Sequence, residues 1–272
     1  MRHLVAGLVL AALLAGPLAG CSRLTFVKAD PNRGDYIQVA PDYKVREGKD
    51  EQRRTLALSL AAAATEALQA GRLGQAEAEA KKALDNDRES SEAHTVLALV
   101  AERRGDAKAA GKHYEEAVKL APGRGATLNN YGAWLCGNGR VAESLPMFDK
   151  ALGDRAYRTP EVALANAGRC RLMAGEGKLA ERYLRLALKL DKDNPVALAG
   201  MARYSYDIGD YMQARAFSER RLAAAAATPE VLLLASQIEQ KLGDMAASAH
   251  YVQRMRNEFP QSQTPRGGVG QQ

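Results

Sequence analysis

The chain has 272 residues, which is long enough for one elongated domain or two compact ones with a substantial core. Its formal charge of +6 arises from 38 basic and 32 acidic residues without a dense basic block, so we expect no nucleic-acid binding. Three cysteines, without a CxxC pair or a His/Cys cluster of ligand spacing, argue against a metal site, and nothing suggests a cofactor.

Residues 1–20 have the pattern of a signal peptide. Arg2 and His3 give a basic start, and residues 4–15 are all apolar or small. This run is shorter than the roughly 20 residues needed to cross a bilayer, but it suits the core of a signal peptide. We therefore expect this segment to be removed after export.

The residues Leu18-Ala19-Gly20-Cys21 resemble the bacterial lipobox, in which the cysteine is lipidated and cleavage occurs before it. The alternative is a cysteine that merely follows a signal peptide. By the same resemblance, Ser22 in place of an aspartate favours the outer membrane. Several acyl chains at Cys21 would give a stable anchor, because a single chain binds a membrane only weakly. The expected location is the outer membrane, facing the periplasm.

The two ends of the mature chain show no sustained apolar period. Residues 21–50 mix prolines, glycines and charges, which predicts a flexible tether after the lipidated cysteine, with an average reach of about 30 Å. Residues 261–272 are rich in Gly and Gln, which predicts a disordered tail.

Residues 51–260 contain six copies of one pattern. Each copy has a turn glycine, and the intervals between these glycines are 34 residues except for one of 36. The glycines are Gly71, Gly105, Gly139, Gly175, Gly209 and Gly243. The extra two residues fall in the segment 153–161, which we expect to be a loop. This period resembles that of the tetratricopeptide repeat, which implies an all-α, right-handed superhelix of six helix pairs with a concave inner face.

Small residues recur seven positions before and five positions after each turn glycine. In the third and fourth copies the earlier position holds Gly132 and Gly168. Paired antiparallel helices cross at these positions, and a small side chain on both lets their backbones approach closely. We therefore expect Gly132 and Gly168 at helix crossings.

The first helix of each tetratricopeptide repeat lines the groove. Counting from the turn glycines gives a set of candidate partner-binding residues, namely Asn129, Ala133, Arg169, Leu172, Arg203 and Tyr206. Arginine and polar groups could hold the carboxylates or carbonyls of a peptide while apolar neighbours take its side chains. The alternative is that some polar residues must face inward in any solenoid.

Cys136 and Cys170 lie 34 residues apart, near the ends of the first helices of the third and fourth repeats. Because such helices pack side by side, the spacing is compatible with a disulfide, as it is with two buried thiols. An exported protein would meet an oxidising compartment.

Signatures of catalysis are missing from the sequence. The chain lacks HExxH, a nucleophile elbow and a Walker A loop, so we expect no enzyme activity and no catalytic residues.

The segments LNNYGAWLCGNGR (128–140), AESLPMFDKAL and ALANAGRC, together with the lipobox, resemble the PilF/PilW lipoproteins of type IV pilus biogenesis. This resemblance covers most of the mature chain. It implies a monomeric pilotin, a lipid-anchored adaptor that binds secretin subunits and promotes their outer-membrane localisation and multimerisation. It also implies a disulfide between Cys136 and Cys170, because some members carry one at the matching positions. The glycine-rich tail departs from the family pattern.

Two alternatives stay open at this point. Lipid-anchored repeat proteins also act as scaffolds for outer-membrane protein insertion or for peptidoglycan hydrolases, and the repeats alone fit those roles equally well. An enzyme of an undescribed type is the third possibility.

Overall fold

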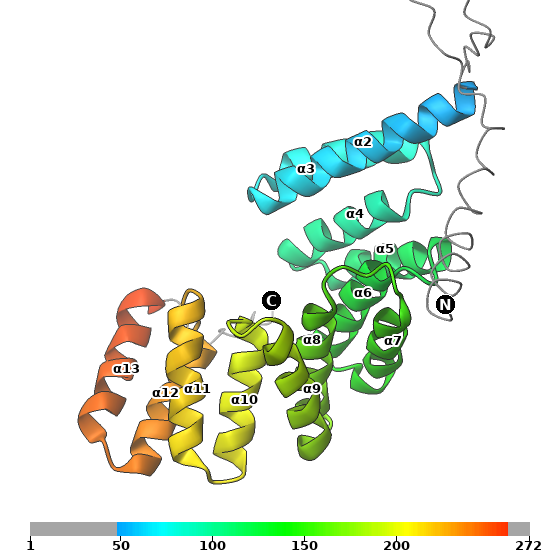
Figure 1. The fold of residues 1–272 in the computed structure, drawn as a ribbon. Coiled ribbons are helices and arrows are strands. Elements are labelled where there is room, and N and C mark those ends of the chain that lie inside the picture. The colour runs from blue at the N-terminus through cyan, green and yellow to red at the C-terminus, as the bar shows by residue number, and fades with distance from the viewer. Residues whose placement is uncertain (1–47, 261–272) are drawn as a thin grey trace, which may run out of the picture. The chain divides into compact units, whose positions relative to one another are not determined.

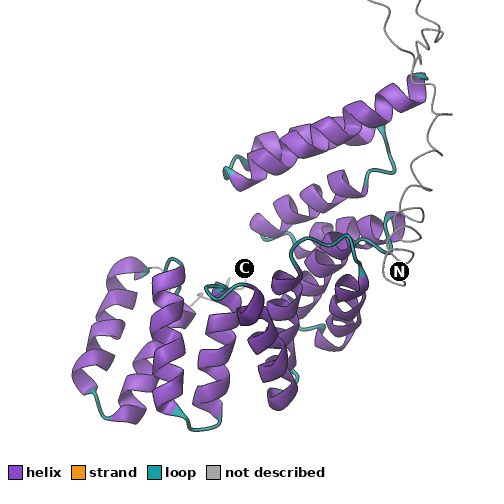
Figure 2. Cartoon of the chain, viewed as in Figure 1, coloured by secondary structure: helices purple, strands orange, loops and turns teal. Residues whose placement is uncertain are grey.

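The computed structural model describes residues 48–260, which form α-helices joined by short turns (Figures 1 and 2). The helices are α2 (Lys49–Gln69), α3 (Leu73–Asn86), α4 (Ser91–Arg103), α5 (Ala107–Leu120), α6 (Gly125–Gly137), α7 (Val141–Gly153), α8 (Pro160–Met173), α9 (Gly177–Leu190), α10 (Pro195–Asp207), α11 (Tyr211–Ala224), α12 (Pro229–Leu242) and α13 (Met245–Glu258). No strand occurs between residues 48 and 260, and the expected all-α class is confirmed.

The helices form six consecutive pairs, from α2–α3 to α12–α13, one for each predicted repeat (Figure 1). Each first helix also contacts the first helix of the next pair, and within residues 48–260 no comparable contact joins one second helix to the next. The first helices therefore form the closely spaced inner row, and the second helices lie on the outside. This arrangement confirms the predicted superhelix of helix pairs.

A glycine in the left-handed region ends the first helix of every pair. The six turn glycines have φ between 73° and 82°, a conformation that favours residues without a Cβ. After Gly105, for example, the amide of Asp106 donates to the carbonyl of Ala101 at 2.9 Å, which closes the turn. The Asp106 side chain then accepts a hydrogen bond from Ala109 N at 2.9 Å and so caps the second helix.

The small residues at the predicted crossings are buried in all six pairs. A Cβ added to Gly132 would lie 2.9 Å from Phe148 Cε1 on the paired helix. A Cβ on Gly168 would lie 2.6 Å from Leu184 Cγ, and one on Gly200 would lie 2.7 Å from Leu184 Cδ2. Leu184 of α9 thus fits between glycines of α8 and α10, which lets these helices pack closely.

The loop with the two extra residues is anchored to the preceding repeat. Asp154 Oδ2 accepts a hydrogen bond from the amide of Gly125 at 2.8 Å. A Cβ on Gly125 would come within 2.7 Å of Tyr157, so this ring covers the start of α6. The two-residue insertion lies in the loop between α7 and α8, at its predicted place, and it interrupts neither helix.

The predicted signal peptide, Cys21 and the predicted tail 261–272 lie outside the described residues. The predicted tether ends at residue 50 and the predicted repeats begin at residue 51. Helix α2 begins two residues earlier, at Lys49. Helix α13 ends at Glu258, close to the predicted end of the repeats at residue 260.

Candidate functional site

The repetition of the same helix register in successive repeats brings two predicted groove residues, Arg169 and Arg203, together. Arg169 on α8 and Arg203 on α10 both stand six positions before a turn glycine. Because α8 and α10 contact each other side by side, equivalent positions on them face the same space. Leu172, one turn of helix beyond Arg169, reaches this space as well.

These three residues line a pocket of about 260 Å³ on the inner row of helices. Three successive first helices, α8, α10 and α12, supply its walls. The lining residues are Arg169, Leu172, Met173, Ala199, Gly200, Arg203, Glu230, Val231 and Leu234. Most of the lining residues are apolar, and the charged ones are of both signs.

Arg169 is the charged group drawn furthest into this pocket. Burial lowers the pKa of its guanidinium from the ordinary value of arginine. Within residues 48–260 it forms no hydrogen bond and no ion pair. Its cost of desolvation is therefore not offset inside the described part of the chain.

The other charged groups of the pocket are better solvated. Arg203 Nε forms an ion pair with Asp207 on the same helix at 3.0 Å, and both side chains are about half exposed. Glu230, at the start of α12, is exposed and forms no ion pair with another described residue. Neither Asp207 nor Glu230 forms an ion pair with Arg169.

Three of the predicted groove residues lie elsewhere. Asn129 is 5% exposed, and its Oδ1 accepts a hydrogen bond from Asn166 Nδ2 at 3.1 Å, so it joins α6 to α8 instead of facing a ligand. Ala133 is half-buried against the cluster around Cys136. Tyr206 packs against Tyr211 near the α10–α11 turn, with ring centroids 5.6 Å apart.

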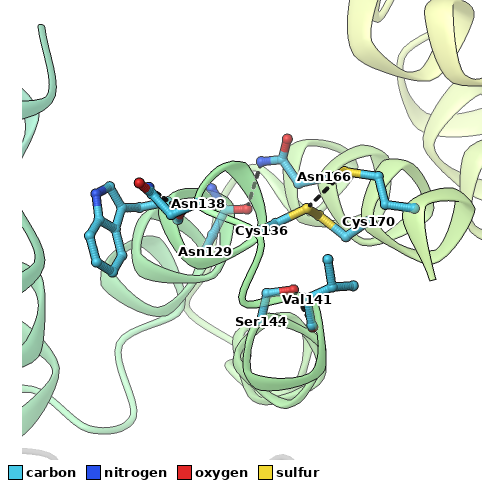
Figure 3. The surroundings of a disulfide bond; sticks show 9 residues. Asn129, Cys136, Asn138, Val141, Ser144, Asn166 and Cys170 are labelled. Carbon is cyan, nitrogen blue, oxygen red and sulfur yellow. Dashed lines mark hydrogen bonds between the residues drawn. A yellow bond between two sulfur atoms is a disulfide. The ribbon is translucent and has the colours of Figure 1, made fainter. Parts of the chain in front are cut away.

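Cys136 on α6 and Cys170 on α8 are joined by a disulfide with a Cα–Cα distance of 5.9 Å (Figure 3). Both residues are fully buried in a cluster with Phe148 and Ala167. The sulfur of Met173 lies 3.6 Å from Cys136 Sγ, a packing contact because a disulfide has no proton to donate. Since Met173 also lines the pocket, the disulfide supports one wall of it from behind.

A polar network around Arg171 connects α8 to α7, to α9 and to the turn before α9. The guanidinium of Arg171 lies 4.7 Å from the ring centroid of Tyr183, and its Nη1 donates to Glu176 at 2.6 Å. Tyr183 in turn donates to Asp149 of the third repeat at 3.3 Å. The junction between the third and fourth repeats therefore combines a buried disulfide with a charged network around Arg171.

Half of the pocket residues that sequence reasoning missed come from α12, and the others are Met173 on α8 and Ala199 and Gly200 on α10. Glu230 stands thirteen positions before Gly243, where the same groove count carried into the sixth repeat would have found it. Val231 and Leu234 occupy positions that the count does not assign to the groove. They reach the pocket because α12 continues the row beyond α10.

Among residues 48–260, no group of three or more His, Cys, Asp or Glu side chains is arranged to hold a metal ion. Over the same range, every helix is too short or too polar to cross a bilayer.

Comparison with known proteins gives consistent matches. The tetratricopeptide-repeat family model matches residues 61–124. The type IV pilus assembly protein PilF of Pseudomonas aeruginosa is 27% identical over 195 residues, which cover 72% of this chain and 77% of PilF. The crystal structure of PilW, described as a widely conserved type IV pilus biogenesis factor, has a TM-score of 0.65 and 29% identity, covering 79% of this chain and 95% of PilW.

A solved structure of P. aeruginosa PilF also has a TM-score of 0.65, with 25% identity over 77% of this chain and 95% of that one. The stacked helix pairs have the fold of a tetratricopeptide-repeat protein. Within that class, the chain is similar to PilF and PilW over most of its length.

Proposed function

We propose that this protein is a pilotin of type IV pilus biogenesis, an outer-membrane lipoprotein that binds secretin subunits and promotes their localisation and multimerisation. The observation that carries the proposal is the similarity to PilF and PilW, which extends over 72% to 79% of the chain. This span is too long to reflect a shared pair of repeats alone, and it includes the junction with the disulfide.

The repeat architecture suits an adaptor. A stack of helix pairs presents an extended inner surface, and solenoids use such surfaces to hold segments of other proteins. The pocket between α8, α10 and α12 offers apolar walls beside Arg169, which has no counter-charge among the described residues, and this combination is suited to a protein ligand. We assign the protein a non-catalytic role on this basis.

Membrane attachment completes the proposal. The Leu18-Ala19-Gly20-Cys21 segment provides the lipidation site, and the helical repeats begin only at Lys49. A lipid at Cys21 would hold the repeats near the outer membrane, where secretin subunits must arrive.

Affinity purification of the lipidated protein from its own membranes tests the proposal. Secretin subunits should be the main partner recovered, and they should be lost when the membranes come from a strain without secretin-dependent pili. Recovery of the outer-membrane protein insertion machinery or of peptidoglycan hydrolases, without secretin, would favour the scaffold role instead and contradict the pilotin assignment.

A further inference from the structure

Arg169 differs from the other arginines that are withdrawn from solvent. Arg171 donates to Glu176 at 2.6 Å, and Arg221 donates to the backbone carbonyl of Ala225 at 3.0 Å. Arg169 has no such partner within residues 48–260, and burial lowers the pKa of its side chain. Charges that are withdrawn from solvent in proteins are normally paired, so this one indicates a counter-charge supplied from outside residues 48–260.

The guanidinium of Arg169 remains open to an incoming group. None of its nitrogens belongs to the fully enclosed, unpartnered polar atoms of the described residues, which are Trp134 Nε1 and Arg171 Nε. It opens into the pocket together with Leu172 from its own helix and with Val231 and Leu234 from α12. A ligand in the pocket would therefore meet a cation and an apolar surface together.

The charges around the pocket favour an anionic ligand at Arg169. Arg203 already has Asp207 as its partner at 3.0 Å, and Glu230 is exposed in the first turn of α12. A carboxylate can take two parallel hydrogen bonds from one guanidinium, which is the strongest pairing open to arginine. Such a pair would offset the free-energy cost of withdrawing the Arg169 guanidinium from water, which no described residue offsets.

The size of the pocket limits what it can hold. Its volume of about 260 Å³ is below the roughly 300 to 1,000 Å³ typical of sites for cofactors and drug-sized molecules. One or two side chains of a peptide fit such a space better than a complete small molecule. An aliphatic side chain would bury its surface against Leu172 and Leu234.

We propose that this pocket binds a peptide segment of the partner protein in which a Glu or Asp lies beside a Leu, Ile, Val or Met. The carboxylate pairs with Arg169, and the aliphatic side chain packs against Leu172 and Leu234. This inference rests on the proposed function, because it takes the partner to be a protein of the pilus machinery, and it adds the chemistry by which a segment is recognised.

The test uses 15-residue synthetic peptides that tile the secretin and the other type IV pilus proteins of the source organism. They are probed with the full chain carrying Cys21→Ala, and affinities of the bound peptides are measured by fluorescence anisotropy. Arg169→Gln should weaken binding about tenfold or more, the effect of a lost charge-assisted hydrogen bond. Arg182→Gln, an exposed arginine of the outer helix α9, is the matched control and should leave binding unchanged.

A double-mutant cycle isolates the pairing. Replacing the acidic residue of a bound peptide by its amide should cost as much as Arg169→Gln, and the two changes together should cost little more than either. Additive effects, bound peptides without an acidic residue, or no bound peptide at all would overturn the inference. Acidic peptides that bind through Arg169 but come only from proteins other than the secretin would support the pocket chemistry and contradict the secretin part of the proposed function.

Discussion

At the scale of single residues, the repeat pattern predicts positions better than contacts. The turn glycines could be read from their spacing because each repeat needs the same left-handed turn. Asn129 shows the limit of this reasoning. Its groove position follows from the count, yet Asn166 of the next repeat reaches its carbonyl group and buries it. Such a contact depends on the offset between two helices, which the spacing of the glycines does not determine.

Gly168 provides a direct test of the close approach of α8 and α9. Gly168→Ala should lower the free energy of unfolding by about 1 to 3 kcal/mol, because the new Cβ would lie 2.6 Å from Leu184 Cγ and 3.2 Å from the backbone oxygen of Ala180. Urea unfolding of the full chain measures the effect. Gly74→Ala is the control, since its Cβ would meet nothing within 4 Å. Equal midpoints for the two variants would contradict the predicted packing.

A histidine pair in the second repeat makes stability depend on pH. His94 Nδ1 and His113 Nδ1 lie 3.1 Å apart, which requires one ring nitrogen to be without a proton. Burial lowers the pKa of both imidazoles, against the opposing effect of Glu116 on His94. The unfolded chain therefore binds more protons than the folded chain once the pH falls below about 6.5.

The folded protein should thus lose stability as the pH is lowered from about 7.5 toward 5.5, because protonation favours the unfolded chain. The variant His94→Gln/His113→Gln should lose less over the same interval, as measured by urea midpoints at each pH. His250→Gln, at an exposed position on α13, serves as the control. A double variant as sensitive to pH as the wild type would show that the pair is not responsible.

At the scale of helices, the junction between the third and fourth repeats has the most specialised contacts. A two-residue insertion separates α7 from α8, and solenoids derive their stability from contacts between neighbouring repeats. The disulfide joins α6 to α8 across this junction, and the Arg171 network joins α8 to Asp149 of α7. The spacing of the cysteines allowed either a disulfide or two thiols, because sequence distance alone does not determine how side chains meet.

Removing the disulfide should destabilise this junction. Cys136→Ala/Cys170→Ala should lower the free energy of unfolding by about 3 to 4 kcal/mol at most, the chain-entropy value for a loop of about 35 residues. The comparison is made by urea unfolding in the Cys21→Ala background, with and without reductant. Reductant should destabilise the disulfide-bonded protein and leave the double variant unchanged. Coincident unfolding curves for all samples would rule out a stabilising bridge.

The pocket shows why counting positions from the turn glycines does not find all of the residues that line it. Arg169, Leu172 and Arg203 could be placed on the inner row from the register of α8 and α10. Val231 and Leu234 could not, because the depth to which α12 closes the pocket depends on the packing between successive pairs. The sequence therefore predicts residues of the walls formed by α8 and α10 and misses most of the wall formed by α12.

At the scale of the whole molecule, six copies of one sequence pattern are enough to predict the all-α class and the stacking of the helix pairs. This is because each helix pair contacts mainly its neighbours. The proposed attachment to the membrane is a separate question, and it rests on lipidation of Cys21. Cys21→Ala should abolish metabolic labelling with palmitate and stable membrane association, because the proposed acyl chains at this residue provide the anchor. Gly20 and the rest of the signal segment remain unchanged in this variant. Palmitate labelling that persists in it would refute the lipidation site.

The measurement that tests the pilotin assignment most directly is the amount of detergent-resistant secretin multimer in the outer-membrane fraction. In a strain that lacks this protein, multimers should be lost while secretin monomers persist, and the wild-type gene should restore them whereas Cys21→Ala should not. If the multimers are present at normal levels in the outer membrane without this protein, its role in secretin assembly is contradicted.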